Sequence, residues 1–383
     1  MLSRRKLNSQ ALTFLCIFAL AFLAVLINNA ILWRFGELNT PETIATKQQA
    51  QNLLYGGLKH PLGTVKIASA RARQAKILVL GTSRAMQLRH QAFSLPFYTY
   101  GGLANGPEQA LSLWHSGGIS DQRPLLTILV ADWWAYGEPS RVAETLRPTQ
   151  PIPFDGQLSG GRADFLIWEL TTSGQFTFDA ILSAAISPKA QTIGLTTALG
   201  GNGFRPDGSL CYLGLGDPSW EANLLTHGLR LRPAQYRPSL AVSQSAMLAL
   251  EKLKEDIERQ GSEFLIIAPP IAPIAYQMAA TDPRFDWIQA WRREMTSRFG
   301  SNFIDTHDPR GLGASNLEFY DDIHPGETAM LRVLDFTLRS RPDLSGFFNL
   351  KAIKEGLENN ASSIFIEEFE TVKCHLPNAT QRP

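Results

Sequence analysis

The chain of 383 residues has few cysteines and no excess of charge of either sign. Its three cysteines form no Cys-x-x-Cys pair and no spacing typical of a zinc site. A formal net charge of +1 argues against a nucleic acid as the partner. The sequence also lacks internal repeats and low-complexity tracts. With 44% apolar and 19% charged residues, the composition is that of a globular protein, long enough for one large domain with appendages.

One long apolar run is present, from Ala11 to Trp33, and basic residues at positions 4 to 6 precede it. A run of about 20 residues is long enough to span a bilayer. The positive charge before it predicts a cytoplasmic N-terminus and an exported remainder, on the periplasmic or extracellular side of the inner or cytoplasmic membrane. A cleavable signal peptide is the alternative, but the run is long for one and no Ala-x-Ala-like site follows it. We expect an uncleaved, single-pass anchor.

The three cysteines are interpreted from this topology. Cys16 lies inside the apolar run and is expected in lipid. Cys211 and Cys374 could form a disulfide in an oxidising compartment, or both could be thiols. The sequence leaves these alternatives open.

Beyond the anchor, short apolar segments alternate with helical patterns, which predicts an α/β fold with a parallel sheet. The expected strands are 76–80, 97–100, 125–130, 263–268 and 302–305. The expected helices are 84–90, 107–114, 164–170, 176–185, 243–260, 283–299 and 327–338. In such a sheet the ligand site lies beyond the C-terminal ends of the strands.

Four residues fall at such strand ends: Ser83, Gly101, Gly102 and Asp132. Ser83 stands where the first strand is followed by a helix, a turn that exposes a hydroxyl next to the free N–H groups of the helix start. A glycine pair after a strand lets backbone N–H groups approach a ligand closely. The alternative is that Ser83 only caps a helix and that the glycines only make a turn.

Among seven histidines, His324 stands out because Asp321 is three residues before it and Pro325 follows it. A serine nucleophile needs a base to take its proton and a group to orient that base. One compact turn could hold this carboxylate against the imidazole, and the proline biases the histidine away from helix. The alternative is an acidic cap at a helix N-terminus.

The Gly-Thr-Ser after the first strand and the Tyr-Asp-Asp-Ile-His-Pro near the end of the domain resemble the SGNH (GDSL-like) hydrolase superfamily. The resemblance implies a flavodoxin-like, three-layer α/β sandwich. It implies Ser83 as the nucleophile, His324 as the base and Asp321 as the residue that orients the base. It also implies Gly101 or Gly102 as an oxyanion donor.

The resemblance covers roughly 76 to 340, with long unmatched insertions, and this sequence departs from the family pattern in two blocks. The first block reads Gly-Thr-Ser-Arg, and the Gly-x-Asn-Asp of the third block is absent. Asp132 stands where an asparagine donor is expected, and a carboxylate cannot donate unless it is protonated. With Thr82 and Arg84 on either side of the serine, the first block resembles that of the membrane-anchored branch of the superfamily. Proteins of this branch look like the periplasmic partners of membrane-bound O-acyltransferases. We expect Arg84 and Asp132 in the oxyanion or substrate-binding part of the site.

The resemblance thus implies an exported, membrane-anchored acyltransferase or esterase that uses a Ser-His-Asp triad. Its substrates would be an acyl donor and the O-acyl groups, acetyl above all, of a cell-surface polysaccharide, with a membrane-bound O-acyltransferase as partner and no cofactor or metal. The first alternative is a catalytically inactive periplasmic scaffold or glycan-binding partner. The second is a metal or phosphatase site built from Asp305, His307 and Asp308 with Asp321 and His324, although their spacing fits no common ligand pattern.

The expected organisation has five parts. They are a cytoplasmic basic tail (1–10), the transmembrane anchor (11–33), a solvated stem or linker (34–75), the α/β domain (76–345) with an insertion at about 137–238, and a C-terminal tail (346–383). The insertion is expected to form one wall of the site, where Arg205 and Asp207 could bind a polar substrate or hold a turn together. Trp133 and Trp134 beside the site could stack on sugars or pack in the core.

Overall fold

A computed structural model describes residues 2–116, 118–138, 176–187, 191–211, 219–231 and 235–369. Its centre is a five-stranded sheet in the order β3-β2-β4-β8-β9, in which every pairing is parallel. The strands are β2 (Ile77–Gly81), β3 (Phe97–Thr99), β4 (Leu126–Val130), β8 (Glu263–Ala268) and β9 (Phe303–Asp305). All five lie where the apolar segments predict them. The expected α/β fold with a parallel sheet is confirmed.

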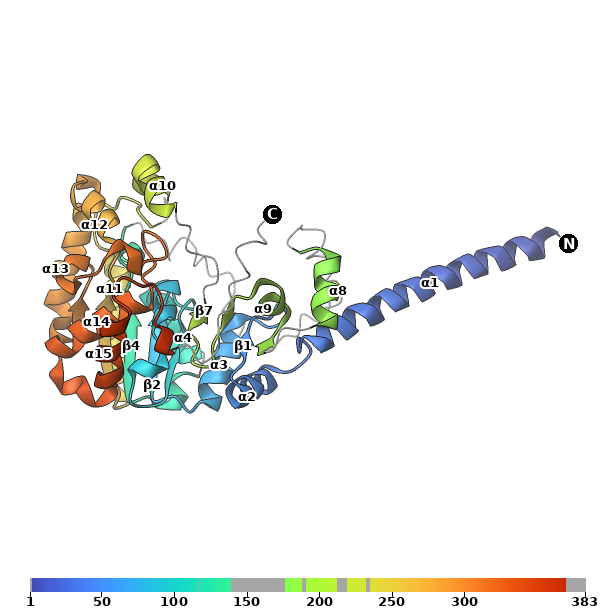
Figure 1. Cartoon of the computed structure of the whole chain (residues 1–383), viewed down its shortest axis with the longest axis horizontal. Coiled ribbons are helices and arrows are strands. Elements are labelled where there is room, and N and C mark those ends of the chain that lie inside the picture. Colours follow the sequence, from blue (N-terminus) through green and yellow to red (C-terminus); the bar gives the residue numbers. More distant parts are fainter. Residues whose placement is uncertain are drawn as a thin grey trace.

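Helices cover both faces of this sheet (Figure 1), which explains why its strands are almost continuously apolar. Side chains alternate along β2, so Leu78 and Leu80 join one core and Ile77 and Val79 join the other. The first core is closed by α4 (Pro107–Ser116), α11 (Gln244–Arg259), α12 (Pro273–Ala280) and α13 (Asp286–Phe299). The second is closed by α14 (Glu327–Ser340) and α15 (Leu350–Asn359). The C-terminal segment up to residue 369 is therefore part of the packed domain.

Most of the helices follow the sequence pattern. The patterns over 107–114, 243–260 and 327–338 correspond to α4, α11 and α14, and Ser243 caps α11 by accepting the Ala246 N–H. The pattern over 283–299 corresponds to a 3₁₀ turn followed by α13. The predicted helix 176–185 is α8 (Phe178–Ile186), and the one over 164–170 lies outside the described residues.

One helix prediction is wrong. The segment 84–90 forms two 3₁₀ turns, η1 (Ser83–Gln87) and η2 (His90–Ala92), with Leu88 and Arg89 extended between them. The Arg89 side chain is buried and ion-paired with Glu327, far along the chain. Tertiary contacts such as this ion pair stabilise the observed non-helical conformation, and they outweigh the local helix propensity of the segment.

A second, smaller sheet has the order β5-β1-β6-β7. Its strands are β1 (Leu54–Tyr55), β5 (Thr192–Ile193), β6 (Gly203–Phe204) and β7 (Leu210–Cys211), and the last two form an antiparallel hairpin. Residues 34–75 do not form a solvated stem, because α2 (Pro41–Gln51), β1 and α3 (Leu62–Ala72) pack together and bury Val65, Ile67 and Ala70. The small sheet thus combines β1 of this segment with three strands of the insertion. The insertion also contains α9 (Leu195–Gly200) and, further along the chain, α10 (Trp220–His227).

The N-terminal helix α1 (Leu2–Arg34) projects away from the folded part (Figure 1). Its stretch Gln10–Arg34 is apolar and long enough to cross a membrane. Cys16 is a free, exposed cysteine on this helix. Cys211 is disulfide-bonded, and Cys374 lies outside the described residues.

Candidate active site

The structure brings Ser83, His324 and Asp321 together, although Ser83 and His324 are 241 residues apart. Ser83 Oγ lies 2.8 Å from His324 Nε2. His324 Nδ1 lies 2.8 Å from Asp321 Oδ2. The histidine and aspartate side chains both retain 21% of their surface in solvent, so the end of this hydrogen-bonded chain is open to a substrate.

The loop before α14 holds the histidine and its carboxylate in one turn. Asp321 Oδ1 accepts the backbone N–H groups of Ile323 at 2.9 Å and His324 at 2.8 Å. The Tyr320 N–H donates to the His324 carbonyl at 3.0 Å. With the carboxylate fixed, Nδ1 carries the proton that it donates to Asp321, and Nε2 is left to accept from Ser83.

Arg84, the residue after Ser83, forms a buried ion pair with Asp132. Arg84 Nη1 lies 2.7 Å from Asp132 Oδ1, and Thr82 Oγ1 donates to the other carboxylate oxygen at 2.5 Å. Arg84 Nη2 also donates to the carbonyls of Pro269 and Pro270. Burial raises the pKa of Asp132, and the neighbouring guanidinium opposes this. Asp132 and both terminal nitrogens of Arg84 are therefore engaged within the protein, where the sequence led us to expect contact with an oxyanion or a substrate.

The two tryptophans after β4 also face this ion pair. The Arg84 guanidinium lies 5.3 Å from the ring centre of Trp133 and 5.5 Å from that of Trp134. Trp133 is buried, and Trp134 is partly buried. The structure thus uses these rings to pack the arginine, which is the packing alternative of the sequence analysis.

Gly101 and Gly102 do not present free N–H groups. The Gly101 N–H donates to Thr99 Oγ1 at 3.0 Å, and the Gly102 N–H donates to the Gly81 carbonyl at 2.9 Å. A Cβ at either position would approach the Met86 side chain to 2.8 Å and 2.2 Å, respectively, and Gly102 has φ +86°. The glycines are therefore explained by close packing and a left-handed turn, with their N–H groups engaged inside the protein.

Two other donors were not singled out from the sequence: the Ser83 N–H itself, and the side chain of Asn105, which lines a cavity together with Thr82, the residue before the serine. Within the described residues, the Ser83 N–H donates to no acceptor. The nearby oxygens of Thr82 bind other groups: Oγ1 accepts the Arg84 N–H at 3.2 Å, and the carbonyl accepts the Ala85 N–H. Asn105 is exposed and lines a small cavity together with Thr82 and Asp132. In the described part of the chain its side-chain amide donates to no other group. Its place in the Gly-Pro-rich turn after β3, at a strand end, was the signal available in the sequence.

The residues of the alternative metal site are engaged elsewhere. Asp305 pairs with Arg292 and Asp308 pairs with Arg310, each at 2.7 Å. His307 is buried against Trp133, 4.9 Å between ring centres, and burial followed by nearby cations lowers its pKa to about 3. Among the residues described, no group of three or more His, Cys, Asp or Glu side chains could hold a metal ion.

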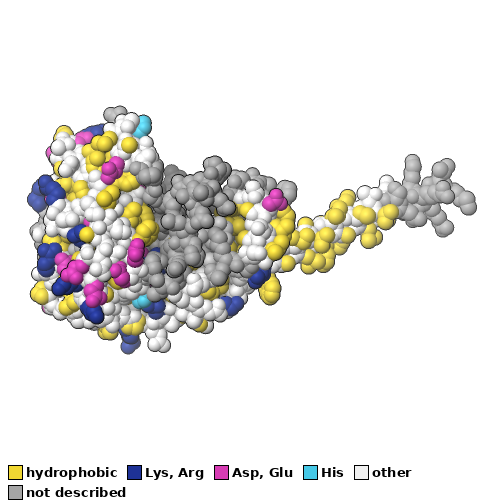
Figure 2. Space-filling model, in the orientation of Figure 1, with side chains coloured by type: hydrophobic (Ala, Val, Ile, Leu, Met, Phe, Trp, Pro, Cys, Tyr) yellow, Lys and Arg dark blue, Asp and Glu magenta, His cyan; other side chains and the backbone are white. Residues whose placement is uncertain are grey.

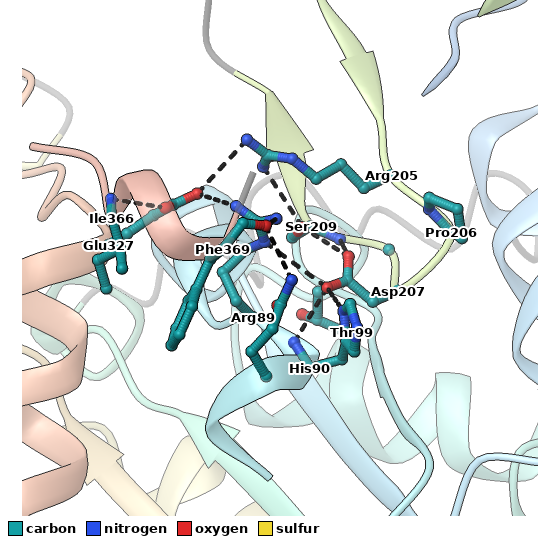
Figure 3. A network of polar contacts seen from close by, with 12 residues as sticks. Arg89, His90, Thr99, Arg205, Pro206, Asp207, Ser209, Glu327, Ile366 and Phe369 are labelled. Atoms are coloured by element: carbon teal, nitrogen blue, oxygen red, sulfur yellow. Dashed lines mark hydrogen bonds and ion pairs between the residues drawn. The ribbon is translucent and has the colours of Figure 1, made fainter. Parts of the chain in front are cut away.

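A buried network of charged side chains joins the segment after Ser83 to the start of α14, which follows His324 (Figure 3). Glu327, close after His324 in the chain, pairs with Arg89 at 2.5 Å and with Arg205 at 3.4 Å. Asp207 accepts from the N–H and the ring of His90, both at 3.0 Å. Burial alone would raise the pKa of Asp207, but the hydrogen bond from His90 and the charge of Arg89 hold it well below its ordinary value.

Arg205 and Asp207 are almost completely buried in this network. They therefore hold the β6–β7 hairpin against η2 and α14, and their side chains are not accessible to a polar substrate. Through Arg89 and Glu327, the same contacts fix the two segments that carry Ser83 and His324 relative to each other.

Comparisons with known proteins give no match: no family model, no curated protein and no solved structure matches the chain. A functional assignment must therefore be argued from this site. The site offers a hydroxyl, an oriented imidazole and a fixed carboxylate at the C-terminal edge of a parallel sheet, and the Asn105 side chain lines a cavity next to Thr82.

Proposed function

We propose that this protein is an exported, membrane-anchored serine acyltransferase or esterase. The observation that carries the proposal is the continuous chain of hydrogen bonds from Ser83 Oγ through His324 to Asp321, with 2.8 Å at each step. This is the arrangement that turns a serine hydroxyl into a nucleophile at neutral pH.

In the proposed reaction, Ser83 Oγ attacks the carbonyl carbon of an ester while His324 Nε2 takes the hydroxyl proton. Asp321 stabilises the imidazolium that forms. The tetrahedral intermediate collapses as the bond to the leaving alcohol breaks, and His324 gives that alcohol its proton. The resulting acyl-serine is then attacked by water in an esterase, or by an acceptor hydroxyl in a transferase, with His324 as base once more.

The negative charge of the tetrahedral intermediate needs hydrogen-bond donors. We assign this role to the Ser83 N–H, at the start of η1, and to the side-chain amide of Asn105. The assignment replaces Gly101, Gly102 and Asp132, whose groups are engaged within the protein.

Two features support the proposed relationship to the SGNH superfamily. Numbered along the chain, the strands of the main sheet have the order 2-1-3-4-5, which is the flavodoxin-like order. Nucleophile and base lie at the start and at the end of this α/β unit, as the resemblance implies. The acyl groups of a cell-surface polysaccharide, and a membrane-bound O-acyltransferase as partner, follow in this proposal from the resemblance together with the apolar helix α1.

The second candidate is a catalytically inactive periplasmic scaffold or glycan-binding protein. The observation that favours it is the engagement of both glycine N–H groups, together with a carboxylate at position 132 that is bound to Arg84. Such a protein would keep the geometry of the triad without turnover.

Hydrolysis of p-nitrophenyl acetate by the full chain in detergent micelles separates the two candidates. We expect wild-type turnover, and a loss of at least about 10³-fold in kcat in Ser83→Ala and in His324→Ala. The matched controls Ser301→Ala and His227→Ala change exposed residues of the same types and should keep wild-type rates. A wild-type protein without turnover, or turnover that survives both triad changes, would favour the scaffold.

A further inference from the structure

The short helix α8 presents an apolar stripe to solvent. Phe178, Leu182 and Ile186 are 48%, 41% and 73% exposed, and they follow one another at intervals of four residues. Residues at this spacing lie along one side of a helix. The neighbouring side of α8 carries Ile181, which is fully buried. The stripe is therefore an exposed apolar side of α8 that lies next to the side packed against the rest of the protein.

Contacts fix α8 to the end of α1 (Figure 1). Ile181 shares a buried cluster with Ile31, Leu32 and Phe35 at the end of the long helix. Arg34 Nε donates to the Ala185 carbonyl at 3.2 Å. Because Ile186 directly follows Ala185, the end of the stripe lies at the level of Arg34 along α1.

The position of Arg34 relative to a membrane follows from the length of α1. The exposed large apolar side chains of α1 run continuously from Leu12 to Ile27. At about 1.5 Å per residue this stretch is roughly 25 Å long, close to the ~30 Å of a hydrocarbon core. Trp33, which is 73% exposed, and Arg34 then lie at headgroup level, where tryptophan and basic residues are enriched.

We propose that α8 lies in the membrane interface, with Phe178, Leu182 and Ile186 in contact with lipid. Asp179 and Ser183 continue the helix surface beyond the stripe, so α8 has the buried, apolar and polar sides of an interfacial helix. Figure 2 shows that the apolar surface of the projecting helix continues onto the folded part where the two meet. The occupant is thus the bilayer that α1 crosses. The inference rests on α1 spanning the membrane and does not depend on the serine chemistry.

A label on the stripe tests this in the full chain, reconstituted alone into phosphatidylcholine nanodiscs. A nitrobenzoxadiazole dye is attached to Leu182→Cys in a Cys16→Ser background, and a sample without the introduced cysteine gives the background labelling. Leu248→Cys, an exposed leucine on α11, is the matched control, and Phe18→Cys reports the span. We expect nitroxide-labelled lipid to quench the dye at 182 and at 18 at least several-fold more than at 248, with iodide showing the reverse order.

The proposal is overturned if the dye at 182 is quenched by iodide as strongly as the dye at 248 while the dye at 18 reports lipid. It is also overturned if the dye at 182 is shielded from both quenchers, since protein would then cover the stripe. If iodide quenches the dye at 18, α1 does not cross the membrane, and the proposed contact of α8 with lipid is overturned with it. Ile186→Cys repeats the measurement at a second position if Leu182→Cys does not fold, and none of these outcomes bears on esterase activity.

Discussion

Arg84 and Asp132 form an almost completely buried ion pair beside Ser83, with Nη1 and Oδ1 2.7 Å apart. The same carboxylate accepts from Thr82, so the residues on both sides of Ser83 are bound to one group. Asp132 follows β4, and the carbonyls of Pro269 and Pro270 that also bind Arg84 follow β8. The turn that carries the serine is thus tied to the ends of the two neighbouring strands in the sheet order β2-β4-β8.

Breaking this pair from one side should destabilise the protein more than removing it altogether. Arg84→Met leaves the Asp132 carboxylate buried without its cation, and we expect a loss of roughly 3–5 kcal/mol in the free energy of unfolding. The double variant Arg84→Met/Asp132→Leu removes the orphaned charge and should recover most of that loss. Urea unfolding of the full chain in micelles measures both variants, and a double variant no more stable than Arg84→Met would contradict the interpretation.

Asp321→Asn should lower kcat by roughly 10³–10⁴-fold and leave KM nearly unchanged. An amide in this position favours the wrong imidazole tautomer while the loop keeps its shape. Steady-state kinetics with p-nitrophenyl acetate give the two constants separately. Asp335→Asn, on the exposed side of α14, is the control and should match the wild type. Equal kcat values in the two variants would remove Asp321 from the mechanism.

Asn105→Ala should lower kcat by about 10²–10³-fold if its amide stabilises the oxyanion. Asn105→Asp should be at least as impaired, because an ionised carboxylate accepts but does not donate. Asn359→Ala, an exposed asparagine at the end of α15, serves as the control. A wild-type kcat in Asn105→Ala would show that this residue only lines the cavity.

Lys66 should make stability depend on pH above neutrality. It is buried, with Nζ donating to the carbonyls of Gly101 at 2.7 Å and Gly208 at 3.0 Å, and burial lowers its pKa to about 7 while Asp207 opposes the shift. Between pH 7 and the unfolded value of about 10.4, the unfolded chain binds a proton that the folded chain does not, so stability rises with pH. Below pH 7 both states are protonated and this contribution is constant.

The measurement for Lys66 is a comparison with Lys66→Met. We expect the free energy of unfolding of the wild type to rise relative to that of the variant by roughly 1.4 kcal/mol per pH unit from pH 7 to 10. Parallel curves for the two proteins over this range would mean that Lys66 keeps its proton in the folded state.

The main sheet could be predicted from the sequence because each of its strands is a short apolar run that alternates with helical patterns. Ser83, Asp321 and His324 could be predicted as partners because the two short blocks that contain them resemble those of the SGNH superfamily; the spacing alone joined only Asp321 to His324. The roles of Arg84 and Asp132 could not, since a charged residue at a strand end looks the same whether it binds a ligand or a buried partner.

The same limit explains the other differences. The N–H groups of Gly101 and Gly102 are engaged by Thr99 and Gly81, which only the folded backbone reveals. The segment 34–75 looked like a spacer because its apolar side chains are buried by partners far along the chain: Val65 packs with Ile193 of the insertion, and Ile67 joins the core of the main sheet. Tertiary contacts of this kind leave no periodic signal in the sequence.

Reaction with a fluorophosphonate shows whether Ser83 is a nucleophile activated by His324, because the reagent phosphonylates activated serines. The full chain is treated with the reagent, digested and analysed by mass spectrometry to locate the covalent adduct. We expect one adduct on Ser83, none on that peptide in Ser83→Ala, and labelling slowed at least about 10³-fold in His324→Ala. A wild-type protein that takes up no reagent at Ser83, or that is labelled there equally fast without His324, would contradict it.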